Sequence, residues 1–311
     1  MLYQLSYTPK YPDNEQRAGE LPARRRVRLI AARARDVAAV RGGGKRGSSA
    51  ARRRDRRPGM VSARMALVPA LLLAAAVAAL AWFTWRDRAE YARFKLLTET
   101  ADRQRRYRAW LVTAFLLFFV GSLGVLGVTG RLAAVIREPT GFLPLTAALR
   151  RALPSHLVSP ELLGGMVSGL AIAVVAITVL SVRRGPQAQA VQLGDINALL
   201  PRNGAETLWT LLLSINAGVS EELFFRLLLP LLFALAFGHV AIGFALAVVA
   251  FGLAHLYQGW VGVLATGLVG AVFTALYLWS GSLAVPIVLH VIIDLIGLVV
   301  RPTATRLLGR R

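Results

Sequence analysis

Seven stretches of the chain are long and apolar enough to cross a lipid bilayer as helices, which requires about 20 mostly apolar residues each. These stretches are residues 66–85, 109–128, 162–182, 206–237, 240–257, 260–279 and 282–300. With 56% hydrophobic residues and a mean hydropathy of +0.55, the 311-residue chain is too apolar for an ordinary soluble domain. Because a backbone in hydrocarbon must satisfy its own hydrogen bonds, we expect an all-α, polytopic membrane bundle of about seven transmembrane helices, within a range of six to eight.

The fourth stretch, residues 206–237, is too long for one straight span. At 1.5 Å per residue it would reach roughly 48 Å, whereas the hydrocarbon core of a bilayer is about 30 Å thick. It therefore either projects from the bilayer or breaks near Gly218, with Ser220 capping a second helix.

The distribution of Lys and Arg indicates an orientation, because short cytoplasmic loops carry an excess of these residues. The loop 86–108 carries eight of them, the loop 183–204 three and the tail 301–311 four. With seven spans these three segments share one side, and the opposite loop 129–161 carries only four. We expect a multi-pass protein of the cell membrane with a cytoplasmic C-terminus.

Residues 1–64 favour the opposite orientation, because they are the most basic part of a chain whose net charge is +21. They have no periodic apolar face, and we interpret them as a disordered leader or an upstream extension that precedes a real start at Met60 or Met65. A chain that begins at either methionine should then insert and fold as well as the full one. The alternative is a miscounted span, for example if residues 142–160 dip into the membrane. No nucleic-acid-binding motif accompanies the charge, so we expect no nucleic-acid partner.

Two adjacent acids, Glu221 and Glu222, interrupt the apolar stretch 206–237. A carboxylate in hydrocarbon costs about 2.5–3.5 kcal/mol or more, so such residues are functional candidates. Residues four apart share a helical face, so Glu222 can pair with Arg226, while Glu221 points about 100° away and has no sequence-local cation. A purely structural ion pair would explain Glu222 and Arg226. It would not explain Glu221, which is free to act as a general base.

Two more ionisable patterns follow, Phe251-x-x-x-His255 and His290-x-x-x-Asp294. A single histidine in an apolar helix is more often a satisfied core residue, but two such patterns after an acid pair indicate a site. Asp294 can accept a hydrogen bond from a ring nitrogen of His290 and so fix its tautomer. We expect Glu221, His255 and His290 to meet in one cavity within the membrane. The other two histidines, His156 and His239, are not assigned to the site.

Several chemistries are excluded. The chain has no cysteine, so it has no disulfides, thiol nucleophiles or Cys-ligated zinc. It also lacks the His-Glu-x-x-His, Gly-x-Ser-Gly and Gly-x-Gly-Asp motifs of other intramembrane proteases.

In order along the chain, Glu221-Glu222-x-x-x-Arg226, Phe251-x-x-x-His255 and His290-x-x-x-Asp294 resemble the EExxxR, FxxxH and HxxxN/D motifs of one family. This is the CAAX-protease and bacteriocin-processing (CPBP, Abi-type) family of intramembrane endopeptidases. The resemblance covers a core at residues 195–300, and Leu199-Leu200-Pro201-Arg202 also looks like the family. The N-terminal transmembrane helices and basic loops at 65–194 and the basic tail at 301–311 lie outside that core.

The resemblance implies hydrolysis of peptide bonds inside the bilayer. By it, Glu221 and His255 activate a water molecule, His290 and residue 294 bind the oxyanion, and Arg226 stabilises the acid cluster. An ionised Asp294 cannot donate a hydrogen bond to an oxyanion. It is therefore either protonated, or it orients His290, which then donates alone.

A zinc ion bound by Glu221, His255, His290 and Asp294 is the alternative to a metal-free, cofactor-free site, which we favour. The partners implied are the lipid bilayer and a peptide or lipidated protein, since the family's eukaryotic members act on prenylated C-terminal peptides. Two non-enzymatic functions stay open. One is a polytopic transport or binding protein that uses the polar cluster for ions or protons, and the other is a catalytically silent immunity or scaffold protein of the same fold.

Overall fold

The computed structural model describes residues 58–152 and 194–308 and, between these ranges, four isolated helical positions (Gly165, Gly169, Ile172 and Ala176). Residues 1–57 of the basic leader, His156 and most of the predicted span 162–182 lie outside the described residues. The ordered elements within the described ranges are helices, with no strand among them, which confirms the predicted all-α class.

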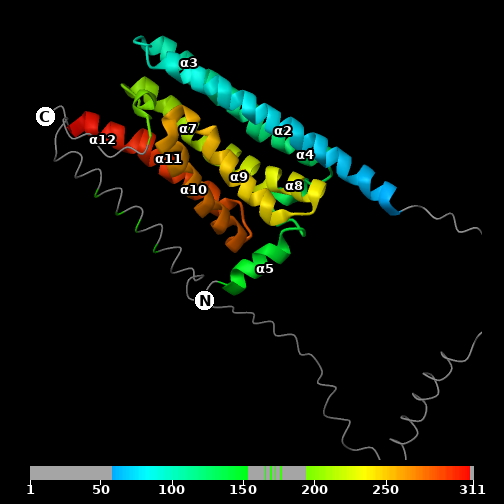
Figure 1. Cartoon of the computed structure of the whole chain (residues 1–311). Coiled ribbons are helices and arrows are strands. Elements are labelled where there is room, and N and C mark those ends of the chain that lie inside the picture. Colours follow the sequence, from blue (N-terminus) through cyan, green and yellow to red (C-terminus); the bar gives the residue numbers. More distant parts are fainter. Residues whose placement is uncertain are drawn as a thin grey trace, which may run out of the picture. The chain divides into compact units, whose positions relative to one another are not determined.

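The first two long helices form a hairpin (Figure 1). Helix α2 (Pro58–Phe94) lies beside a second helix that is built from α3 (Thr100–Ala114), the π-helical turn η1 (Phe115–Val120) and α4 (Gly121–Val128). Aromatic pairs join the two, with ring centroids 5.0 Å apart for Phe83–Phe118 and 5.1 Å apart for Phe94–Tyr107. The predicted loop 86–108 is wrong, because both helices extend into it and leave only residues 95–99 as the connection.

The central helix carries the acid pair. It consists of α7 (Gly204–Glu222), the π-helical segment η5 (Leu223–Leu228) and α8 (Leu229–Phe237), and every residue of η5 is buried. The predicted break near Gly218 does not occur: Glu222 keeps helical angles of φ −64° and ψ −41°, and the Ser220 hydroxyl donates to the Asn216 carbonyl at 2.6 Å. The acids therefore lie within a continuous helix and not at the positive end of a new one.

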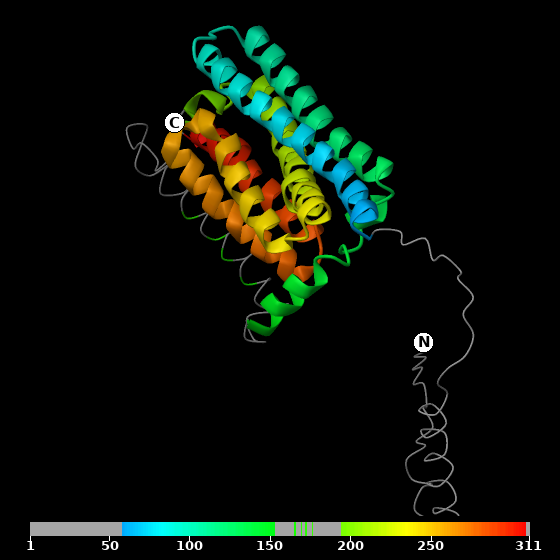
Figure 2. The ribbon, with the colours of Figure 1, turned by 45° about the vertical axis from the view of Figure 1, so that its right-hand side comes forward.

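The remaining elements complete the described part of the bundle. They are η2 (Leu132–Val135), α5 (Leu143–Ala152), η4 (Asn197–Leu199), α9 (Val240–Ala254), η6 (Leu256–Gln258), α10 (Gly259–Ser280), α11 (Ala284–Leu295), η7 (Ile296–Val300) and α12 (Arg301–Leu308). Helices α9 and α11 pack on the central helix, α9 on its α8 part and α11 on its α7 part, and α10 packs on both of them (Figure 2). The three motifs thus arrive from neighbouring helices.

Four helical segments in the described ranges are long and apolar enough to cross a membrane: Ala66–Phe94, Thr100–Val128, Leu256–Ser280 and Ala284–Leu307. Val240–Ala254 is apolar but shorter, and the predicted count of seven spans is not confirmed. The distribution of side chains agrees with a lipid environment. Large apolar side chains are exposed on the outside, Leu264 at 74% and Leu268 at 69%, whereas Glu222 and Arg226 are buried inside.

The described parts of the three basic segments meet at one end of the bundle. Lys95 forms an ion pair with Asp195, Arg202 Nη1 donates to the Leu97 carbonyl at 3.4 Å, and Arg306 Nη2 donates to Thr207 Oγ1 at 2.9 Å. The segments assigned to one side from their Lys and Arg content therefore do lie together.

Gly218 sets the distance between α7 and α11. A Cβ atom on Gly218 would lie 2.4 Å from Cγ2 and 2.9 Å from the backbone nitrogen of Val291, closer than real Cβ atoms come. Val291 directly follows His290, so this close approach also brings the acid pair within reach of that histidine.

We predict that Gly218→Ala destabilises the fold, because the added methyl group must push α7 and α11 apart. Overpacking of this kind costs about 1–3 kcal/mol. Thermal unfolding of the full chain in detergent should show a midpoint lowered by several degrees. Gly124→Ala is the matched control, since a Cβ there meets no atom within 4 Å. Equal midpoints for the two variants would contradict the role given to Gly218.

Candidate active site

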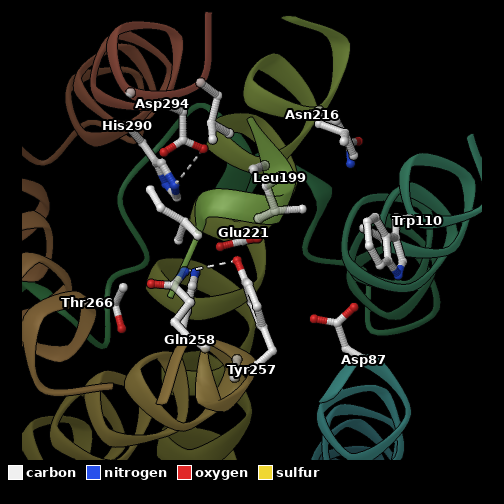
Figure 3. A pocket seen from close by; sticks show the side chains of 18 of the residues that line it. Asp87, Trp110, Leu199, Asn216, Glu221, Tyr257, Gln258, Thr266, His290 and Asp294 are labelled. Carbon is white, nitrogen blue, oxygen red and sulfur yellow. Dashed lines mark hydrogen bonds and ion pairs between the residues drawn. The ribbon is translucent and has the colours of Figure 1, made fainter. Parts of the chain in front are cut away.

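The motif residues meet at one cavity of about 340 Å³, whose lining includes Glu221, His255, His290 and Asp294. Glu221 comes from α7, His255 from the C-terminal end of α9, and His290 and Asp294 from α11. Figure 3 shows the Glu221, His290 and Asp294 side chains around this cavity. The expectation that these helices bring one acid and two histidines to a common cavity is confirmed.

Glu222 lies behind the cavity wall and binds two partners. One carboxylate oxygen, Oε1, accepts from His290 Nδ1 at 2.7 Å, and the other, Oε2, lies 3.0 Å from Arg226 Nε. The contact with Arg226 is an ion pair without the alignment of a hydrogen bond, so its attraction is Coulombic. Both charged side chains are buried. The i,i+4 pair expected from the sequence is therefore present, with His290 added to it.

Arg226 is fixed by aromatic rings and by one carbonyl. Its guanidinium carbon lies 4.2 Å from the centroid of the Phe251 ring and 5.5 Å from that of Phe273, within the range of cation–π attraction. Its Nη2 donates to the Gly270 carbonyl at 3.3 Å. Phe251 also lies edge-on to His290, with centroids 6.0 Å apart. The phenylalanine of the second motif thus packs against both the arginine of the first and the histidine of the third.

Glu221 faces the cavity with one oxygen free. Its Oε2 is buried and makes no hydrogen bond to any described residue. The two adjacent acids therefore have different environments, as the 100° helical separation predicts. Because neither Glu221 oxygen forms a hydrogen bond with a described residue and the side chain lines the cavity, this carboxylate is placed to take a proton from a water molecule.

The ring of His255 is oriented by its own helix. Its Nδ1 lies 2.8 Å from the Phe251 carbonyl, which can only accept, so Nδ1 carries the hydrogen. In the neutral ring Nε2 is then an acceptor. The i,i+4 spacing of the second motif thus presets one tautomer of the histidine.

His290 is held by Glu222 more closely than by Asp294. Its Nε2 lies 3.8 Å from Asp294 Oδ2, beyond hydrogen-bonding distance, while Nδ1 makes the 2.7 Å contact with Glu222. The expectation that Asp294 fixes the tautomer of His290 is therefore corrected: Glu222 does so, and Asp294 faces the other ring nitrogen.

Metal binding was the alternative use of these four residues. Within the described ranges, no three or more His, Asp or Glu residues are grouped so that they could hold a metal ion. The Nδ1 atoms of both histidines are engaged by the protein, His255 with a carbonyl and His290 with Glu222. In both histidines Nε2 is therefore the ring nitrogen that remains without a hydrogen bond to the described residues.

Several cavity residues were not expected from the sequence. Asp87 and Trp110 form the wall contributed by the α2–α3 hairpin, and Tyr257 follows His255 (Figure 3). The Tyr257 hydroxyl accepts from Gln258 Nε2 at 2.9 Å. Asp87 could have been identified from its place at the end of an apolar span, if that span had been extended beyond residue 85.

A second buried charge cluster lies near the basic end. Glu206 accepts from Arg103 Nε at 3.1 Å and from Arg202 Nη2 at 3.0 Å, and its own backbone N–H donates to Asn203 Oδ1 at 2.9 Å. Arg202 is the last residue of the Leu-Leu-Pro-Arg stretch noted in the sequence. This cluster fixes the start of α7, the helix that carries the acid pair.

The fold and the site together define a multi-pass helical membrane protein with an enclosed acid–histidine centre. Residues 203–296 match the family model described as type II CAAX prenyl endopeptidase Rce1-like, and these residues include all three motifs. The resemblance to the CAAX-protease family is thereby confirmed for this part of the chain. No curated protein and no solved structure gives a match.

We predict opposite phenotypes for the two adjacent acids. Glu222→Gln leaves Arg226 without its charge partner in the interior and should destabilise the protein by about 3–5 kcal/mol. Glu221→Gln removes no described hydrogen bond at Oε2 and should leave the unfolding midpoint nearly unchanged. Thermal unfolding and membrane expression of both variants test this. If Glu221→Gln proves the more destabilising, the environments assigned to the two carboxylates are wrong.

Proposed function

We propose that the chain is an intramembrane endopeptidase that hydrolyses peptide bonds of membrane-associated or prenylated-type substrates. The observation that carries this proposal is the open carboxylate of Glu221 in a cavity it shares with two oriented histidines. The match to the CAAX endopeptidase model supports proteolysis over transport, immunity or scaffold functions.

The reaction begins with a water molecule between Glu221 and His255. Glu221, with His255 Nε2 as a second acceptor, takes a proton as the water oxygen attacks the scissile carbonyl carbon. The carbonyl π electrons move to its oxygen and form an oxyanion. The oxyanion electrons re-form the C=O bond as the C–N bond breaks, and the proton held by Glu221 passes to the leaving nitrogen. A carboxylic acid and an amine are released, and the acid then loses its proton to water.

His290 stabilises the oxyanion. Its Nδ1–H is committed to Glu222, so only Nε2 can donate into the cavity, and it does so when the ring carries both protons. Two carboxylates, Glu222 and Asp294, flank the ring and favour this cationic form. Asp294 thus acts through His290 as a positioning residue, and Arg226 neutralises Glu222 from the other side.

A neighbouring apolar hollow supports lipidated substrates. It has a volume of about 430 Å³ and lies between the α3–η1 helix and α7. Its lining is apolar except for Asn216, and Asn216 also lines the catalytic cavity. A hydrocarbon chain in this hollow would place the attached peptide beside Glu221.

Besides the peptide substrate, the lipid bilayer is the partner that we propose. We place the basic end of the bundle and the C-terminus on the cytoplasmic side of the cell membrane.

The purified full chain in detergent should cleave an internally quenched peptide, and Glu221→Gln should lower kcat by about 10²-fold or more. His255→Ala should have an effect of similar size. The matched control is His239→Ala, because His239 is exposed in the turn before α9 and does not line the cavity. A wild-type protein that cleaves no peptide while Glu221→Gln abolishes an ion flux would establish transport instead.

We also expect the activity to be independent of metal. Dialysis against a strong chelator should leave kcat/KM unchanged, and elemental analysis should find less than one zinc per chain. One tightly bound zinc per chain, with activity restored only when zinc is added back, would overturn this. Glu221, His255, His290 and Asp294 would then be its ligands.

A further inference from the structure

Asp87 is an acid on a membrane-spanning helix whose role the proposed mechanism does not explain. It lies on α2, within the span Ala66–Phe94, and lines the catalytic cavity. In Figure 3 its carboxylate points into the cavity from the α2 side, beside Trp110, while His290 and Asp294 lie across from it. Asp87 therefore faces any substrate that reaches Glu221.

The neighbouring acid on the same helix shows what a paired carboxylate looks like here. Glu90 lies 2.7 Å from Arg86 Nε and 3.1 Å from Arg106 Nη1, and it accepts from Trp110 Nε1 at 3.0 Å. For Asp87, in contrast, no ion pair or side-chain hydrogen bond is formed with any residue in the described ranges. A carboxylate in a largely apolar cavity without a partner is costly, so a ligand that carries the missing positive charge would bind there favourably.

The composition of the cavity wall points to an organic cation. Asp87, Glu221 and Asp294 are acids, and no Lys or Arg is among the described residues that line the cavity. The α2–α3 part of the lining also contains aromatic side chains, and two of them, Phe83 and Trp110, carry no cation of the described residues over their rings, whereas Lys95 lies over Tyr91 and Arg103 over Tyr107. Aromatic faces attract ammonium and guanidinium groups, and a carboxylate supplies the counter-charge.

We propose that Asp87 and the aromatic wall around it form a specificity subsite for a basic side chain, Lys or Arg, of the substrate. This subsite rests on the proposed function, because it assigns the residue that the endopeptidase accepts next to the scissile bond. Since Asp87 lies across the cavity from His290, the basic residue points toward α2 while the scissile carbonyl lies at Glu221 and His290.

Cleavage preference tests the subsite directly. The purified full chain is incubated with a proteome-derived peptide library in detergent, and the cut sites are mapped by mass spectrometry. We expect Lys or Arg to be enriched at one position flanking the cut. Asp87→Asn should raise KM for peptides with Lys or Arg at that position by about tenfold or more and leave their kcat nearly unchanged. For peptides in which norleucine replaces the basic residue, the same variant should change neither KM nor kcat appreciably. Asp87→Lys should shift the cleavage preference toward peptides with Glu at the same position. Asp102→Asn is the matched control, since it removes an exposed acid that pairs with Arg105 outside the cavity.

Binding of a small cation tests the subsite without cleavage. Thermal stabilisation of the full chain by 1-aminopentane should exceed that by 1-pentanol. This excess stabilisation by the amine should be lost in Asp87→Asn and kept in Glu221→Gln. If the amine instead depends on Glu221, or if the Asn variant keeps the wild-type preference, the subsite is refuted while the endopeptidase stands. Amine binding that depends on Asp87 in a protein that cleaves nothing would establish a cation site at Asp87 and refute both the proteolytic function and the assignment of this site to a substrate side chain.

Discussion

The rest of the site depends on the contacts of one buried carboxylate, that of Glu222, which has an arginine on one oxygen and a histidine on the other. Leaving one charge of a buried pair without its partner costs about 3–5 kcal/mol, so the Glu222 carboxylate and the Arg226 guanidinium depend on each other. Through His290 this carboxylate joins α7 to α11. Through Arg226 it reaches the Gly270 carbonyl on α10 and the Phe251 ring on α9. One charge therefore ties together the helices that carry all three motifs.

Adjacent residues on a helix point about 100° apart, and the site uses this difference to divide two tasks between two identical side chains. Glu222 turns inward and is saturated by protein partners, whereas Glu221 turns to the cavity and keeps an oxygen free. The π-helical segment Leu223–Leu228 begins directly after the pair. Such segments are frequent at functional sites, because one extra residue per turn re-aims the side chains that follow. Here Arg226 lies within that segment and still reaches Glu222.

The sequence predicted what depends on local spacing and missed what depends on packing between helices. The Glu222–Arg226 pair follows from i,i+4 geometry, and the gathering of Glu221, His255 and His290 follows from the cost of burying each alone. The 2.7 Å contact from Glu222 to His290 could not be predicted, because it requires the close approach of α7 and α11 at Gly218. Asp87 was missed because the basic residues around it indicated a loop, although the helix continues to Phe94.

The same contact also resolves the chemical difficulty of an acid at position 294. An ionised Asp cannot donate to an oxyanion, so it cannot act there as an amide side chain would. With Nδ1 of His290 committed to Glu222, the remaining donor is Nε2–H, which exists only on the protonated ring. Asp294 Oδ2, at 3.8 Å from Nε2, is close enough to favour that proton by its charge and too far to hold it in a hydrogen bond. In the proposed reaction, Asp294 would therefore act on this donor through its charge and leave the Nε2 hydrogen available to the substrate oxygen.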